Sequence, residues 1–323
     1  MRYWSRIKGC SNVTKNEAER IIIKSKLVFQ NNMEFGIYKD RGLDNGYGVV
    51  LNKVSETMRS LIVPHFVTRI SSRIRVCISN LEEVAIDTDN IEIEEQAFFS
   101  SGLTRVKIDT NNCSIGNCAF ALNENLAEVE INGNNVEIGE IAFSDSGIKD
   151  IKLSHGVKYI GAYVFEGNKL RKINMPDSIC NRDKVSFPDD LVGMCAYNRD
   201  LKEVTLSKNI TALSTDMFRG CTELKYIELH EGLERIGSNV FTGSGVKELV
   251  VPSTVGYLSW SSISGSSIEK LVILNHDIRT ANNRSMYNSL KQLKMLQAPR
   301  KIIDEIRKRG IIFNSDTQVV ELD

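Results

Sequence analysis

The chain has 323 residues, of which 41% are apolar and 25% are charged, as is typical of folded proteins. Its 41 basic residues balance 41 acidic ones, which argues against a general nucleic-acid-binding role, because such proteins carry clustered positive charge. No stretch approaches the roughly 18 apolar residues of a membrane-spanning helix, and the first ten residues lack the apolar core of a secretory signal. We therefore expect a cytoplasmic protein without a membrane partner, with cell-surface or virion attachment as the alternative.

Residues 1–57 predict an N-terminal cap made of a helix and a β-hairpin. Thr14 and Glu17 have the spacing of a capping box, in which each side chain satisfies a free backbone N–H at a helix start. Residues 35–38 and 47–51 are strand-like and flank a turn-rich segment, which predicts the hairpin. A cap of this kind would shield the apolar edge of whatever follows it.

From residue 58 onward one strand motif recurs: an apolar residue, two spacers, an apolar residue, one spacer and a third apolar residue. Its middle residue recurs at Leu61, Val84, Val106, Val129, Ile151, Ile173, Val204, Ile227, Leu249, Leu271 and Leu293. Successive copies lie 22 or 23 residues apart, with one interval of 31. A fixed period of this length predicts a solenoid over residues 58–297, in which each turn buries its apolar edge against its neighbours.

A second marker runs in phase with the strands, as a small or aliphatic residue followed by an aromatic one. The pairs are Ala97-Phe98, Ala119-Phe120, Ala142-Phe143, Val164-Phe165, Ala196-Tyr197, Met217-Phe218 and Val240-Phe241. Two motifs in one register indicate a true repeat.

The segments Ile138–Phe143 and Ile160–Phe165, each followed by a Leu-x-x-Ile-x-Leu type strand, resemble leucine-rich repeats of the BspA type. The resemblance covers roughly residues 58 to 296. It implies an α/β solenoid with a curved parallel β-sheet of about 11 leucine-rich repeats between an N-terminal and a C-terminal cap. It also implies protein or surface recognition, with no enzymatic activity in the repeats themselves.

The long interval places an insertion near residues 180–191. An insertion in a solenoid emerges as a loop on one face. A tolerated surface loop and a partner-binding loop both fit this polar segment.

Residues 298–323 predict a C-terminal helical cap. Pro299 stands near a first helical position, residues 302, 303 and 306 form one apolar stripe, and Gly310 suits the helix end. Short strands are expected at 311–313 and 319–322. The helix carries a basic patch made of Arg300, Lys301, Arg307, Lys308 and Arg309.

Known catalytic and metal-binding motifs are missing from the sequence. The four histidines are far apart along the repeats, and the seven cysteines follow no metal-ligand spacing. We expect reduced, structural cysteines, no catalytic or metal site and no cofactor.

The outward positions of the last predicted strands differ from the rest, because they are apolar. Tyr226, Val250, Val272, Leu274 and Leu296 would form an exposed apolar patch, with Glu228, Lys270 and Lys294 as its polar rim. Such a patch is typical of a protein-binding surface. The alternative is that the C-terminal segment folds back and covers it.

These features favour a non-catalytic recognition module that binds a partner protein through the sheet face and the insertion loop. The alternative is an enzyme or nucleic-acid factor whose active element lies in residues 1–57. Residues 81–95 carry a charge of −7 and residues 279–309 a charge of +7. This asymmetry favours head-to-tail self-association or capture of an acidic partner, and two solvated charge runs fit it equally well.

Overall fold

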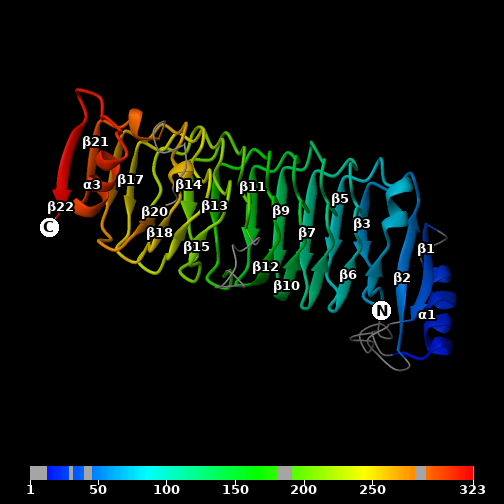
Figure 1. Ribbon diagram of the computed structural model, residues 1–323. Helices are drawn as coiled ribbons and strands as arrows, with labels where there is room; N and C mark the ends of the chain where they lie inside the picture. Colours follow the sequence, from blue (N-terminus) through cyan, green and yellow to red (C-terminus); the bar gives the residue numbers. More distant parts are fainter. Residues whose placement is uncertain (1–12, 29–31, 40–45, 181–190, 281–288, 323) are drawn as a thin grey trace. The chain divides into compact units, whose positions relative to one another are not determined.

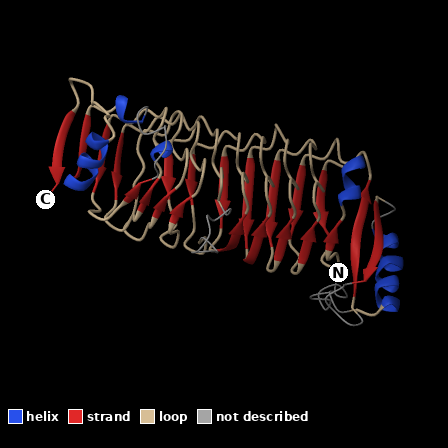
Figure 2. Ribbon diagram, viewed as in Figure 1, coloured by secondary structure: helices blue, strands red, loops and turns tan. Residues whose placement is uncertain are grey.

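The computed structural model describes residues 13–28, 32–39, 46–180, 191–280 and 289–322 (Figure 1). The chain forms two compact units, residues 1–160 and residues 161–323. Among the regular elements of the described parts of both units, strands far outnumber helices (Figure 2). Each unit is therefore a stretch of parallel β-solenoid, and the α/β label is not confirmed.

The first unit begins with the predicted helix and hairpin. Helix α1 (Lys15–Val28) starts at a capping box, because Glu17 N–H donates to Thr14 Oγ1 at 3.3 Å and Thr14 N–H donates to Glu17 Oε2 at 2.8 Å. Strands β1 (Met33–Lys39) and β2 (Tyr47–Val54) pair antiparallel, and α1 packs on both. Most of the predicted turn, residues 40–45, lies outside the described residues.

The repeats of the first unit form one parallel sheet in the order β11-β9-β7-β5-β3. Its strands are β3 (Ser60–Val63), β5 (Glu83–Ile86), β7 (Arg105–Asp109), β9 (Glu128–Asn132) and β11 (Asp150–Leu153). The middle residues of the first five motif copies pair in register, which confirms this part of the repeat. Burial alternates along these strands, as expected when one face lies on the core.

A second parallel sheet, which the strand motif did not predict, runs through the same turns. Its order is β1-β2-β4-β6-β8-β10-β12, with β1 antiparallel at the edge. The added strands are β4 (Arg69–Ile70), β6 (Ile91–Ile93), β8 (Cys113–Ile115), β10 (Asn134–Ile138) and β12 (Gly156–Ile160). The 3-10 helix η3 (Ser72–Cys77) follows β4.

Asparagine ladders close the corner between the two sheets. Asn112 Nδ2 donates to Asn90 Oδ1 at 3.0 Å, and Asn135 Nδ2 donates to Asn112 Oδ1 at 2.8 Å. These three residues share positive φ angles, a conformation that asparagine tolerates better than most residues. The ladder repeats one side-chain hydrogen bond at each turn and so holds the corners in register.

The third side of each turn contains the aromatic marker. Phe98, Phe120 and Phe143 are fully buried, and neighbouring rings stack with centroids 5.0 Å apart. Phe98 N–H donates to the carbonyl of Ala119 at 2.8 Å, one turn further along. The predicted pairs are therefore core residues of successive turns.

The second unit has the same construction. One face carries β13 (Lys172–Asn174) with β14 (Glu203–Thr205), and β17 (Glu248–Val251), β19 (Lys270–Ile273), β21 (Met295–Pro299) and β22 (Gln318–Leu322). The other carries β15 (Ala212–Leu213), β16 (Arg235–Ile236), β18 (Tyr257–Leu258) and β20 (Arg279–Thr280), with the 3-10 helix η4 (Trp260–Ser262) after β18. Between β14 and β17, Leu224 and Ile227 are buried as predicted, but their segment is not a regular strand.

The last predicted motif is in the wrong register. Strand β21 pairs with β19 so that Leu296 lies opposite Leu271. The buried motif is thus Leu293, Leu296 and Ala298, and the interval between the middle residues is 25 instead of 22. The predicted motif of Leu290, Leu293 and Met295 keeps the 22-residue interval, whereas the strand itself lies three residues further along the chain.

The fifth aromatic marker, Ala196-Tyr197, is wrong as well. Cys195 N–H donates to the carbonyl of Met217, as Phe165 N–H does to Met194 and Phe218 N–H to Val240. Cys195 therefore occupies the phenylalanine position and is fully buried. Tyr197, two residues later, is 40% exposed. Tyr197 is the predicted residue at this position because the 31-residue interval gives no fixed spacing from which the buried position could be counted.

Helix α3 (Arg300–Lys308) forms as predicted and buries Ile302, Ile303 and Ile306. It lies beside β20, since Thr280 Oγ1 is 3.3 Å from Glu305 Oε1. Strand β22 forms close to the predicted place and pairs parallel with β21. The strand predicted at 311–313 is not present, and residues 181–190 of the predicted insertion lie outside the described residues.

Candidate functional site

The predicted apolar patch on the sheet face of the second unit is smaller than expected. Tyr226, Val250 and Leu274, which we call the sheet-face patch, are 65%, 41% and 38% exposed. Leu296 is fully buried because the register shift turns it inward, and Val272 is only 8% exposed. Val272 lies on β19, which has β17 on one side and β21 on the other. The prediction that these two residues are exposed is wrong.

Ion pairs form the rim of the sheet-face patch. Lys270 Nζ lies 2.7 Å from Glu248 Oε1, and Glu269 accepts hydrogen bonds from Lys294 and Lys247, which hold the pKa of its carboxyl below the usual value. These pairs are solvent-exposed, so each stabilises the fold little. Together they form a polar border around the sheet-face patch.

Tyr226 stands where the sheet is interrupted. Its segment follows β14 and precedes β17 without forming a regular strand, although Lys247 N–H still donates to the carbonyl of Lys225 at 3.2 Å. The predicted rim residue Glu228 is exposed beside it. The backbone beside Tyr226 is therefore hydrogen-bonded to the next turn, while its side chain remains exposed.

The basic patch is exposed along α3. Arg300 and Arg307 each lie 3.9 Å from Asp304, Lys301 lies 3.8 Å from Asp277, and Arg309 pairs with Glu305. Lys308 makes no ion pair within the described residues. In the first three of these pairs the basic side chains of Arg300, Lys301 and Arg307 are more than 60% exposed. These cations therefore remain available to an anionic ligand.

The acidic stretch at 81–95 is partly neutralised by arginines of neighbouring turns. Arg59 pairs with Glu82, and Arg105 pairs with Glu128 one strand further on, beside Glu83. Arg69 pairs with Glu92 at 2.6 Å and lies 3.8 Å from Glu94. Part of this charge therefore has a structural role.

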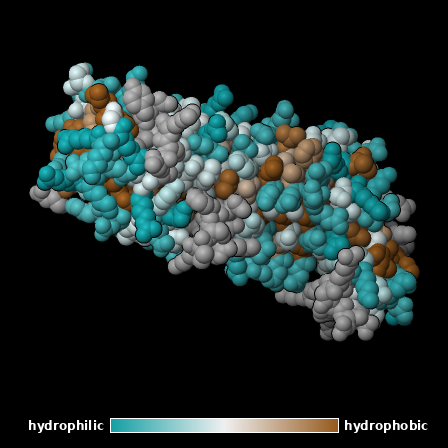
Figure 3. All heavy atoms as spheres, viewed as in Figure 1, coloured by the Kyte–Doolittle hydropathy of each residue, from teal (hydrophilic) through white to brown (hydrophobic). Residues whose placement is uncertain are grey.

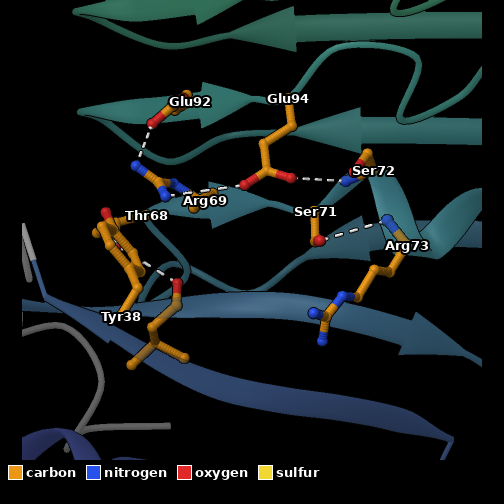
Figure 4. A network of polar contacts seen from close by, with 9 residues as sticks. Tyr38, Thr68, Arg69, Ser71, Ser72, Arg73, Glu92 and Glu94 are labelled. Carbon is orange, nitrogen blue, oxygen red and sulfur yellow. Dashed lines mark hydrogen bonds and ion pairs between the residues drawn. The ribbon is translucent and has the colours of Figure 1, made fainter.

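Figure 4 shows the network around Arg69. The carboxylate of Glu94 also accepts a hydrogen bond from Ser72 N–H at 2.9 Å, and Tyr38 OH lies 3.1 Å from Thr68 Oγ1. Strands β1, β4 and β6 are thereby tied together. Head-to-tail self-association through the two charged stretches stays a prediction.

A cluster that none of the predicted site residues belongs to lies on the turn side of the second unit. The tyrosine cluster consists of Tyr163, Tyr197, Asp216 and Arg219. Arg219 lies 3.4 Å from Asp216, and its guanidinium carbon is 5.7 Å from the centroid of the Tyr197 ring. Burial, with Asp216 as the next cause, raises the pKa of Tyr163.

Each tyrosine of this cluster lies over a glycine of the next turn. A Cβ atom on Gly193 would lie 2.2 Å from ring atoms of Tyr163, and one on Gly220 would lie 2.6 Å from the ring of Tyr197. The repeated glycine one turn after a tyrosine is the signal in the sequence that could have located the cluster.

Within the described ranges, no group of three or more His, Cys, Asp or Glu residues could hold a metal ion. His230 is engaged with the backbone, its Nε2 lying 3.0 Å from the carbonyl of Ser207. None of the described helices has the length and hydrophobicity that crossing a membrane requires.

Comparison with known families gives one match. The profile of the BspA type leucine-rich repeat region matches residues 58–191 and 193–310, in six copies. The chain belongs to this family. The match covers both units, including the tyrosine cluster and the sheet-face patch. BspA-type proteins share the leucine-rich repeat fold, whose members are generally protein-interaction modules and typically non-enzymatic scaffolds.

Solved structures of bacterial leucine-rich repeat proteins are similar to this chain. A leucine-rich repeat protein from Bacteroides ovatus is 14% identical, with 91% of this chain and 99% of that chain covered and a TM-score of 0.50. A Treponema pallidum leucine-rich repeat protein is 21% identical, covering 66% and 86%, with a TM-score of 0.43. A leucine-rich cell surface protein from Faecalibacterium prausnitzii is 16% identical, covering 81% and 96%, with a TM-score of 0.34. No curated protein matches.

Proposed function

We propose that this BspA-type protein is a non-catalytic recognition module that binds a partner protein through the sheet-face patch of its second unit. The observation that carries the proposal is the 65% exposure of Tyr226 on the same face as the exposed Val250 and Leu274. Tyrosine is enriched among residues that dominate binding energy, because it offers a large rigid contact area with one polar end.

The ion pairs around the patch suit the rim of such an interface. A polar rim excludes water from the apolar anchors and orients the partner without adding much affinity. The pairs of Lys270 with Glu248 and of Lys294 with Glu269 provide both signs of charge. A partner would therefore present an apolar pocket for Tyr226 with mixed charges around it.

The proposal is tested by affinity capture from the native host, followed by calorimetry with the captured partner. Tyr226→Ala and Leu274→Ser should each weaken binding by more than about tenfold, the size expected for an anchor worth about 1.4–2 kcal/mol. Tyr226→Phe keeps the ring and should bind nearly normally. Tyr197→Ala is the matched control, because it removes an exposed tyrosine from the turn side.

A partner that binds Tyr226→Ala and Leu274→Ser as tightly as the unaltered chain contradicts the proposal. If the same partner loses affinity with Tyr197→Ala instead, the tyrosine cluster is the interface. The proposal applies in the cytoplasm and equally at a cell surface, the location given in the description of the Faecalibacterium protein.

A further inference from the structure

The loop that follows α3 carries the most exposed large apolar residue in the described part of the chain. Ile312 is 85% exposed. Its neighbours Ile311 and Phe313 are half-buried. Figure 3 shows that hydrophilic residues dominate the visible face and that hydrophobic residues appear there in small separate groups. Val76, at 83%, is the next most exposed large apolar residue among those described.

The end of α3 explains why Ile312 points away from the fold. Gly310 has φ +69° and its N–H donates to the carbonyl of Arg307 at 2.9 Å, while Ile311 N–H donates to the carbonyl of Ile306 at 3.4 Å. These two bonds form a Schellman motif, which commonly packs the residue after the glycine back onto the helix. The next residue, Ile312, is then directed outward.

The other end of the loop is anchored to the last turn of the solenoid. Asn314 Nδ2 donates to the carbonyl of Lys291 at 2.6 Å, and Thr317 Oγ1 donates to the carbonyl of Leu293 at 2.7 Å. The segment 311–313 is thus held between two fixed points, the helix end and the last turn.

Exposed cations lie close to this tip along the chain. Arg307 and Lys308 are exposed in the last turn of α3, immediately before the loop, and Lys291 is exposed beside the Asn314 anchor. Residues 300–317 contain five cations against three acids, Asp304, Glu305 and Asp316, and the pairing of Arg307 with Asp304 is long at 3.9 Å. The local charge is positive although the whole chain is neutral.

We propose that the Ile312 tip and the cations Arg307 and Lys308 bind the surface of a lipid bilayer that contains anionic lipids. An isolated apolar side chain beside exposed cations matches the two layers of such a surface, acyl chains beneath negatively charged headgroups. A folded protein partner fits less well, because protein anchors insert into preformed pockets, whereas a fluid bilayer closes around a protruding residue. This contact is peripheral and requires no membrane-spanning helix.

The test uses the full chain in co-sedimentation with vesicles of phosphatidylcholine alone and of phosphatidylcholine with about 30% phosphatidylserine. Binding to the anionic vesicles should exceed binding to the neutral ones and should fall as salt is raised. Ile312→Ser should weaken binding about tenfold or more, because it removes the inserted side chain. Lys308→Gln should weaken it about fivefold.

Matched controls separate this contact from non-specific adhesion and from the proposed protein-binding function. Ile62→Ser removes a 69% exposed isoleucine in the first unit, and Tyr226→Ala removes the sheet-face anchor; neither should change vesicle binding. Equal binding to both vesicle types, or unchanged binding by Ile312→Ser, overturns the proposal. Binding of poly-glutamate that is insensitive to Ile312→Ser, without vesicle binding, identifies an acidic-protein site and also overturns it.

Discussion

Tyr38 and Arg69 stack on each other although they belong to strands that are not adjacent. The guanidinium carbon of Arg69 lies 3.9 Å from the centroid of the Tyr38 ring (Figure 4). Strand β2 runs between them, and Gly48 of β2 pairs with Tyr38. A Cβ atom on Gly48 would lie 2.5 Å from the Tyr38 ring, so the glycine lets the ring cross β2 and reach β4.

This stacking predicts that Arg69 helps to hold the N-terminal hairpin on the repeats. Arg69→Ala removes a partly buried cation–π contact and two ion pairs, and we expect a loss of about 1–3 kcal/mol in the local stability of β1. Native-state hydrogen exchange of the β1 amides measures this. Arg59→Ala is the matched control, because Arg59 is 74% exposed and its ion pair is with Glu82; its effect should stay below about 1 kcal/mol. Equal effects of the two changes would contradict the assignment.

The repeat period is enough to predict the strands on one face of each unit, but not the second sheet or the register of β21. Buried aliphatic residues recur at a fixed spacing because each turn must cover the one before it. Leu293 and Leu296 both fit the middle position of the apolar motif in the sequence, and only the pairing of Leu296 with Leu271 distinguishes them. Cys195 cannot be recognised from the aromatic marker, because a small residue stands at the buried position that phenylalanine occupies in other turns.

The candidate site was predicted less well than the fold. Inward or outward orientation follows from the period of a strand, but exposure also depends on the strands beside it. Strand β19 lies between β17 and β21, whereas β17 is at the edge of its sheet. Val272 points outward and is nevertheless only 8% exposed, whereas Val250 on the adjacent strand is 41% exposed. A glycine one turn after each tyrosine marks the tyrosine cluster. Recognising it requires knowing which turns stack, and the 31-residue interval interrupts the period that would show this.

The buried cysteines predict a loss of stability at alkaline pH. Burial raises the pKa of the Cys113 and Cys221 thiols to about 12 from an ordinary value of 9.0, and raises the pKa of Cys195 well above that value. The folded state therefore favours the neutral thiols. Their contribution is fully present below about pH 9 and is lost as the pH rises toward 12.

Urea unfolding midpoints between about pH 7 and 11 should fall above pH 9, and the fall should be smaller in a variant with alanine at these three positions. At about pH 8, a thiol reagent followed by peptide mapping should modify the exposed Cys180 quickly and leave the three buried thiols unmodified. Rapid native-state modification of Cys113 or Cys221 would contradict the buried assignment.

Head-to-tail self-association is testable through its salt dependence. Contacts between residues 81–95 of one molecule and 279–309 of another would be exposed ion pairs, which weaken as the screening length shortens. Light scattering should then show larger particles at about 50 mM than at about 500 mM salt, and Arg307→Glu with Lys308→Glu should abolish the difference. A monomer at every salt concentration would exclude this association.

Gly193, beneath Tyr163, is predicted to be less replaceable than Gly243, which lies beneath no tyrosine. It has φ +57°, and Gly243 has φ +69°, so alanine is strained at both positions by about 1 kcal/mol. Space distinguishes them, because a Cβ atom on Gly193 would meet the Tyr163 ring at 2.2 Å, whereas one on Gly243 meets nothing closer than 3.6 Å. Gly193→Ala should therefore cost about 1–3 kcal/mol more than Gly243→Ala in urea unfolding.

A double-mutant cycle with Tyr163→Ala shows where the extra cost arises. If it comes from displacing the ring, Gly193→Ala made in the Tyr163→Ala background should cost no more than Gly243→Ala does in the same background. The coupling energy between positions 163 and 193 should then be about 1–3 kcal/mol, and the coupling between 163 and 243 should be close to zero. If Gly193→Ala is equally costly with and without the ring, backbone strain alone explains the glycine, and Tyr163 is not positioned by it.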